Sequence, residues 1–329
     1  MIRILIATLT ASLLMFACSS EEPAGPGTPT GGQVVLNDPL AGVQIFPPDN
    51  WWNLDISAAP LDSMSDDIIT WIGAGQQLHP DFAPPPYGMP YMSVPGTQAL
   101  ERVAFVLYGS QSDSGAPGRP AGYPIPADAR ITPNYIEGGV AGGGTSGDRH
   151  LLIIDRDNGF LFELFATRWN ANLNRWEAGS GAVFDLGSNS RRTEGWTSAD
   201  AAGLAIFPGL VRYDEANGSA DIDHAFRFTT RATDGHVWPA SHTAGNTAGA
   251  PPLGTRLRLK ASVDLSSYPE AERRIFEAMK RHGLILADNG TDMMIQGTMD
   301  DRWDNDVLNP AFHSLTAGDF EVVQLGYEP

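Results

Sequence analysis

The amino-acid sequence predicts an all-β domain, a jelly-roll-like β-sandwich with two peripheral helices. Three observations predict this fold: the apolar stretches are short, turn-forming residues separate them, and only two segments repeat apolar residues at helical spacing. The 329 residues include 36 Gly and 25 Pro, so long loops are expected to cover much of the surface.

The predicted strands are apolar runs of four to six residues, and Gly, Pro, Asn and Asp residues separate them. They lie at residues 103–108, 151–154, 160–165, 225–229, 256–261, 284–287, 293–296 and 320–325. Runs of this length, separated by turn-forming residues, are typical of strands in sandwiches, jelly rolls and barrels. No internal repeat accompanies them, which argues against a solenoid or propeller.

Two segments have the apolar period of a helix. In residues 61–73, a stripe of Ile and Trp side chains stops at Gly73. In residues 267–283, Ser267 and Glu270 have the spacing of a capping box, and apolar residues then recur every three or four positions. Both segments predict structural helices that pack on a sheet.

The first 17 residues predict a lipoprotein signal peptide. Arg3 precedes an apolar run at residues 4–16, which is shorter than the roughly 20 residues of a membrane-spanning helix. Residues 14–18, Leu-Met-Phe-Ala-Cys, resemble the lipobox of bacterial lipoproteins. That resemblance implies export and lipidation of Cys18, and Ser19 after it implies sorting to the outer membrane of a Gram-negative host.

The rest of the chain predicts a tether and one domain. Residues 18–42 are rich in Ser, Glu, Pro, Gly and Thr, which is typical of a flexible linker between lipid and domain. Residues 43–329 show no second linker and are apolar enough for one β-rich domain with its own core.

Composition excludes several classes of function. Cys18 is the only cysteine, so the predicted domain has neither disulfides nor thiol chemistry. The net charge of −18 repels nucleic acid and anionic membrane, so the lipid is the only expected membrane attachment. The signature motifs of serine hydrolases, zinc proteases and phosphate-binding loops are also absent from the sequence.

Four segments resemble a family of exported bacterial proteins without an assigned activity. They are residues 147–150 (GDRH), 195–203 (GWTSADAAG), 222–229 (IDHAFRFT) and 238–242 (WPASH). The likeness runs from about residue 46 to residue 323. It implies that the four segments belong to one integrated domain, and it supplies no catalytic residues.

Glu163 and Asp200 are the first candidates for catalysis. Glu163 lies in a strand that is apolar on both faces, where burial raises the pKa of a carboxyl toward values useful to a general acid. The alternatives are an ion pair with an arginine or a strand edge facing water. Asp200 ends Thr197-Ser198-Ala199-Asp200, which has capping-box spacing, so it either caps a short helix or lies at a cleft.

The other candidates are charged or aromatic side chains in the four resembling segments. Asp223, His224 and His150 are candidates for catalysis, while Arg149, Trp196, Arg227, Trp238 and His242 are candidates for substrate binding. Tryptophan rings in loops can stack on the apolar faces of sugars, but they can also anchor loops to the core.

No cofactor is expected, and a transition-metal site is disfavoured because the histidines lack the close spacing of metal ligands. The acidic loops at residues 288–292 and 300–306 offer oxygen ligands for a structural calcium, with ordinary turn formation as the alternative.

Together these features predict a surface-anchored, glycan-degrading enzyme that acts on a polysaccharide or oligosaccharide. The hypothesis is a glycoside hydrolase in which Glu163 pairs with Asp200 or Asp223, because cleavage of a glycosidic bond requires two carboxyl groups. Two alternatives remain: a non-catalytic carbohydrate-binding or envelope lipoprotein, and a polysaccharide lyase in which Arg227 neutralises a uronate.

The lipid anchor can be tested at Cys18. We expect Cys18→Ser to release the protein from the membrane fraction or to stop its processing, because serine cannot form the thioether to the lipid. Fractionation and gel mobility measure both effects. Unchanged membrane attachment and mobility of the variant would contradict the anchor.

Overall fold

The computed structural model describes residues 32–40, 45–115 and 119–329; Cys18 and the predicted signal peptide lie outside these residues. The described chain is β-rich, with three sheets and four α-helices. Within the same ranges, no helix has the length and apolar character needed to cross a bilayer.

The first sheet has five strands in the order β1-β3-β5-β6-β9, and a small sheet of order β4-β8-β7 accompanies it. The five strands are β1 (Val35–Leu36), β3 (Tyr91–Val94), β5 (Leu151–Asp155), β6 (Phe160–Phe165) and β9 (Ser180–Asp185). The small sheet contains β4 (Val103–Phe105), β7 (Arg168–Asn170) and β8 (Arg175–Ala178).

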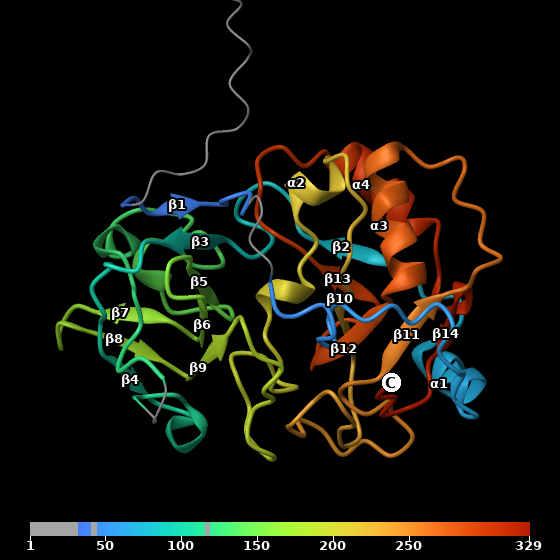
Figure 1. Ribbon diagram of the computed structural model, residues 1–329, viewed down its shortest axis with the longest axis horizontal. Coiled ribbons are helices and arrows are strands. Elements are labelled where there is room, and N and C mark those ends of the chain that lie inside the picture. The colour runs from blue at the N-terminus through green and yellow to red at the C-terminus, as the bar shows by residue number, and fades with distance from the viewer. Residues whose placement is uncertain (1–31, 41–44, 116–118) are drawn as a thin grey trace, which may run out of the picture. The chain divides into compact units, whose positions relative to one another are not determined.

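The second sheet has six strands in the order β14-β11-β12-β10-β13-β2. They are β2 (His79–Asp81), β10 (Phe226–Thr230), β11 (Arg256–Leu259), β12 (Leu284–Asn289), β13 (Met294–Gln296) and β14 (Phe320–Val322). Helices α1 (Ser65–Ile72), α3 (Glu270–Arg281) and α4 (Asn305–His313) lie against this sheet, as Figure 1 shows. The short helix α2 (Tyr213–Ala216) contacts α3.

The expectation of a β-rich domain is confirmed, but the jelly-roll-like topology is not. Four strand pairs are parallel: β3 with β5, β4 with β8, β10 with β12, and β13 with β2. A jelly roll consists of antiparallel strands arranged as two Greek keys, and parallel pairs require crossover connections.

All eight predicted strands are present with small shifts at their ends, and both predicted helices are present. The predicted capping box is wrong, because α3 begins at Glu270 and its N-cap is Pro269, with no side-chain hydrogen bond. Helix α4 was not predicted. Its start falls in an acidic stretch and it contains Pro310, whereas Asp304 caps it by accepting the backbone N–H of Asp306 at 3.0 Å.

The five-stranded sheet is buried on both faces. On β5, Leu151 and Ile153 belong to one apolar cluster, and Leu152 and Ile154 belong to another that includes α3 and β10. Side chains alternate between faces along β6 as well. Glu163 therefore points toward the same cluster as Leu161 and is enclosed by it.

Gly283 after α3 provides a test of the fold. Its φ is 79°, and an added Cβ would lie 2.3 Å from the carbonyl oxygen of Leu257. Gly326 is the control, because its φ is 69° but an added Cβ meets nothing within 4 Å. Both Ala substitutions carry the backbone penalty of about 1 kcal/mol, and we expect Gly283→Ala to lower the free energy of unfolding by about 2 kcal/mol more. Equal losses in urea unfolding would contradict the packing described.

Candidate functional site

A β-bulge near the end of β12 forms one wall of the candidate site. The register of the parallel β10–β12 pair shifts between Phe228 and Thr229, which leaves Ala287 as an extra residue on β12. Such a bulge turns the next side chain, here Asp288, in a new direction. The carbonyl of Ala287 accepts a 2.9 Å hydrogen bond from the N–H of Ala202, so the bulge joins β12 to the segment at residues 195–203.

Asp288 lines a pocket of about 280 Å³, which we call the acidic pocket. Three of the four resembling segments contribute to its walls, because residues from 147–150, 195–203 and 238–242 all line it. Its polar lining consists of Asp148, Asp200, Asp288, His242, Tyr108, Ser180, Thr197, Ser198 and Asn289. A second pocket of about 220 Å³ shares Asp148 and is also lined by Asp81, Glu137 and Arg149.

Asp200 forms a buried ion pair with Arg227. Each residue is 1% exposed, and Nη2 of Arg227 donates to Oδ1 of Asp200 at 2.8 Å. Nη1 of Arg227 donates to Oε1 of Gln296 on β13. Oδ2 of Asp200 is buried and has no hydrogen-bond partner among the described residues. Arg227 therefore holds Asp200 and, contrary to the expectation of substrate contact, does not line the acidic pocket.

The segment around Asp200 is a turn, so the predicted capping box does not form a helix here. The hydroxyl of Thr197 donates to the carbonyl of Asp200 at 2.9 Å, and the N–H of Asp200 donates to Oγ of Ser198 at 2.9 Å. These side chains satisfy the backbone of the turn in place of a helical ladder. The carboxylate of Asp200 takes no part in these bonds. Asp200 pairs with Arg227 and lines the pocket.

Burial raises the pKa of two of the pocket carboxyls. For Asp200 the rise is opposed by the charge of Arg227, and the net direction is upward. For Asp288, burial and then the negative charge of Asp200 raise the pKa to about 6, against the opposing charge of Arg227. Asp288 therefore holds a proton through much of the weakly acidic range.

Glu163 is fully buried and does not line the acidic pocket. Its carboxylate accepts the backbone N–H of Ile206 at 2.8 and 2.9 Å and that of Phe207 at 2.8 Å. Neither an arginine partner nor a water-facing edge, the two alternatives raised from the sequence, describes this environment. Burial raises the pKa of Glu163 to about 7, although the two N–H groups oppose the rise.

His150 forms a second buried pair with Glu137. Its Nδ1 lies 2.7 Å from Oε2 of Glu137, and its Nε2 lies 3.2 Å from the carbonyl oxygen of Ala199. Both ring nitrogens thus face acceptors, which suits the doubly protonated ring. Burial alone would lower the pKa of His150, but Glu137 raises it to about 9.

The residue between Asp148 and His150 has an unusual backbone conformation. Arg149 has a φ of 54°, in the left-handed region that non-glycine residues rarely adopt. The backbone N–H groups of Ala166 and Thr167 donate to the carbonyls of Asp148 and Arg149, at 2.8 and 3.1 Å. These bonds hold the loop so that Asp148 stays exposed at the two pockets while His150 is buried.

His242 is the one predicted binding residue that lines the acidic pocket. Its Nδ1 lies 2.8 Å from the carbonyl oxygen of Ala201. The neighbouring Ser241 donates its backbone N–H to Ala202 and accepts that of Gly195, at 2.9 and 2.7 Å. The segments at residues 195–203 and 238–242 are therefore hydrogen-bonded into one wall.

The tryptophans serve packing in loops and in regular elements, since Trp71 lies in α1, Trp169 in β7 and Trp176 in β8. None of the eight is exposed: they are buried or half-buried, and all lie within the described residues. Trp238 packs edge-to-face on Trp51 at 6.3 Å, and the guanidinium of Arg192 lies 5.6 Å from the ring of Trp196. Neither Trp196 nor Trp238 lines the acidic pocket.

Asp223 and His224 lie apart from the acidic pocket. Asp223 is exposed, whereas His224 is buried just before β10 with its Nε2 3.0 Å from Oε2 of Glu215. Nη2 of Arg212 lies 3.1 Å from the same ring nitrogen. Neither Asp223 nor His224 lines the pocket, so the pairing of Glu163 with Asp223 has no geometric support.

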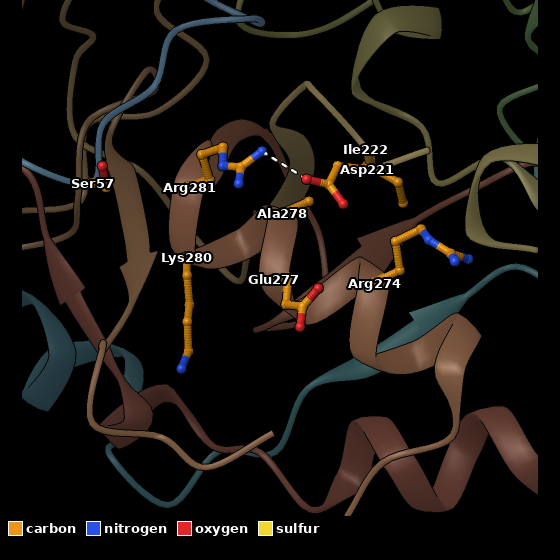
Figure 2. Close-up of a pocket in the computed structure, with 8 residues that line it drawn as sticks. All are labelled: Ser57, Asp221, Ile222, Arg274, Glu277, Ala278, Lys280 and Arg281. Carbon is orange, nitrogen blue, oxygen red and sulfur yellow. Dashed lines mark hydrogen bonds and ion pairs between the residues drawn. The ribbon is translucent and has the colours of Figure 1, made fainter. Parts of the chain in front are cut away.

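A third pocket, of about 270 Å³, lies along α3 (Figure 2). Its cations already have partners: Arg281 pairs with Asp221 at 3.2 Å, Lys280 donates to the carbonyl of Val263 at 2.6 Å, and Arg274 pairs with Glu270 at 2.8 Å. Of the charged side chains that line it, Glu277 alone has neither an ion pair nor a hydrogen bond among the described residues.

The acidic loops mostly contact arginines and backbone. Asp292 pairs with Arg231 at 2.6 Å, Asp300 pairs with Arg302 at 2.6 Å, and Asp304 caps α4. In the parts of the chain that the structure covers, no three or more His, Cys, Asp or Glu side chains are grouped to hold a metal ion. The structural calcium stays a prediction.

No family model, curated protein or solved structure matches this chain. The chemistry of the site therefore has to be inferred from its geometry.

Asp148, Asp288 and Glu137 are the charged residues of the site that sequence reasoning did not single out for catalysis. Asp148 lies in the segment at residues 147–150, and Asp288 directly follows the predicted strand at residues 284–287. A polar residue at the end of an apolar strand was the available signal for Asp288. Glu137 lies in a Gly-rich loop and carries no such signal.

The raised pKa of Glu163 predicts a dependence of stability on pH. Its carboxyl titrates at its ordinary value of 4.5 when unfolded and at about 7 when folded, so the folded state binds the proton more tightly. The stability it contributes is complete below pH 4.5 and is lost as the pH rises to about 7, in total about 3 kcal/mol.

We expect Glu163→Gln to abolish this part of the pH dependence. Urea unfolding between pH 4 and 8 measures it, and Glu328→Gln at the exposed C-terminus is the control, which should follow the parent curve. A Glu163→Gln curve that parallels the parent at every pH would contradict the buried, proton-binding state.

Proposed function

We propose that this chain is a glycoside hydrolase, with Asp288 as the proton donor and Asp148 as the second carboxylate. The observation that carries the proposal is the pair itself: both side chains line the acidic pocket, and the pKa of Asp288 is raised to about 6. Hydrolysis of a glycosidic bond requires one carboxyl that donates a proton and another that is ionised. The pair differs from the one expected from the sequence, because Glu163 and Asp223 do not line this pocket.

The reaction follows from these roles. Asp288 donates its proton to the glycosidic oxygen as the bond between that oxygen and the anomeric carbon breaks. Asp148 removes one proton from a water molecule whose oxygen bonds to the same carbon. One water is added across one bond, and transfer of a proton through solvent restores both carboxyls.

The pair of Glu137 and His150 positions Asp148, because it orders the loop that presents Asp148. Glu163 holds the backbone of Ile206 and Phe207, neither of which lines the acidic pocket. These groups act through the backbone and have no part in proton transfer.

The lyase alternative receives no support. A lyase that acts on a uronate needs a cation to neutralise the substrate carboxylate, but no Lys or Arg is among the residues that line the acidic pocket. Asp148, and Asp288 once it is ionised, would repel a uronate. The proposed substrate is therefore a neutral or cationic polysaccharide or oligosaccharide.

The proposed location is the cell envelope, with the lipid on Cys18 as the attachment. The support is the resemblance of residues 14–18 to a lipobox and the polar stretch that follows.

Asp288→Asn tests the proposed acid. We expect a loss of about 10² to 10⁴-fold in kcat on natural glycans, because the amide has no acidic proton. Aryl glycosides with a good leaving group need little protonation and should retain much of the parent rate. In the parent, kcat/KM should fall above about pH 6 as Asp288 ionises.

Incubation with a panel of polysaccharides, followed by measurement of released products, identifies the substrate. Asp301→Asn, on an exposed turn, is the control variant and should keep the parent rate. Equal losses on natural and aryl substrates, or a fully active Asp288→Asn, would remove Asp288 from the role of acid.

A further inference from the structure

We infer that the acidic pocket binds its ligand through a protonated amino group held by Asp200. In a glycan this group is the free amine of an amino sugar, so the inference names a substrate class. It rests on the proposed function only in taking the ligand to be a glycan.

The first observation is the unsatisfied oxygen of Asp200. Oδ1 receives the guanidinium of Arg227, while Oδ2 is buried without a donor among the described residues. A buried carboxylate oxygen that accepts no hydrogen bond raises the free energy of the folded protein, and a ligand that supplies an N–H offsets this loss. Asp200 is 1% exposed and is one of the residues that line the pocket, so the proposed donor approaches from the pocket.

The second observation is that most of the hydroxyl and amide donors around the pocket are already used, with the hydroxyl of Tyr108 as the exception. Oγ of Ser180 donates to the carbonyl of Ser198 at 2.7 Å, and Oγ1 of Thr197 donates to that of Asp200 at 2.9 Å. Nδ2 of Asn289 donates to the carbonyl of Ala244 at 3.1 Å. These side chains therefore present mainly lone pairs to a ligand.

The third observation is charge. Asp148, Asp200 and Asp288 line the pocket, and Arg227, the cation that compensates Asp200, lies behind it. An ammonium group has three donors, a positive charge and no acceptor, which matches this lining. A hydroxyl or an N-acetyl group brings an acceptor as well and no charge. The net charge of −18 also raises the concentration of cationic ligands at the surface.

Three oligosaccharide series test the inference, because they differ only at C2. Oligomers of β-1,4-linked glucosamine, N-acetylglucosamine and glucose are titrated into the purified, unaltered chain at pH 5.5, where glucosamine is protonated. We expect the glucosamine oligomer to bind at least about tenfold more tightly than the other two, as one charge-assisted hydrogen bond provides. Its affinity should also fall as the salt concentration rises.

Equal binding of the three series, tighter binding of a neutral series, or no binding of any would overturn the inference. A variant then assigns the effect to Asp200. Because Asp200→Asn alone strands the buried charge of Arg227, the variant is the double substitution Asp200→Asn with Arg227→Met, which removes both charges. Its melting curve is compared with that of the parent.

A folded double variant should lose the preference for glucosamine, whereas Asp301→Asn should keep it. A folded double variant that still prefers glucosamine would show that Asp200 does not bind the amino group. If the double variant does not fold, the ligand series on the unaltered chain decides. Tight glucosamine binding without cleavage of any glycan would overturn the proposed hydrolase activity and support the inference. Cleavage of a glycan without a preference for the amine would support the hydrolase activity and overturn the inference.

Discussion

The buried ion pair of Asp200 and Arg227 is the interaction on which the rest of the site depends. It joins β10, at the middle of the six-stranded sheet, to the turn at residues 195–203. Such a pair contributes little net stability, but removing one partner leaves an uncompensated charge in the core. Both the turn and the strand are therefore constrained to one relative position. Gly209 contributes to this constraint, because a Cβ there would lie 3.1 Å from that of Arg227.

Around this pair, each buried charge has its own partner. Glu137 neutralises His150, and Glu163 receives backbone N–H groups where a cation is lacking. These arrangements keep the charges inside an apolar core, where an isolated charge would not be tolerated. Two groups remain: the second oxygen of Asp200, which is buried without a donor among the described residues, and the carboxyl of Asp288, which lines the acidic pocket. The proposed hydrolysis uses Asp288 together with the exposed Asp148, and the proposed binding of an amino group uses Asp200.

Local patterns account for the parts of the fold that were predictable. The eight predicted strands and the helices α1 and α3 follow from apolar period and turn residues, which act within a few positions of the chain. Helix α4 was missed because its stability comes from packing of Phe312 on the core, against an internal proline. Local sequence patterns also do not predict the order of the strands or the parallel pairs, because these depend on crossover connections between distant segments.

The sequence by itself placed Glu163 in a strand that is apolar on both faces, and it marked the strands at residues 151–154, 160–165, 225–229 and 284–287 by their apolar runs. Only the tertiary structure decided which carboxyls share a pocket. Asp288 reaches it through a bulge that shifts the register by one residue, and Asp223 is turned toward solvent. The physical reason is range: burial and alternation follow from neighbours in the chain, whereas the partner of a charge is set by strands that meet only after folding.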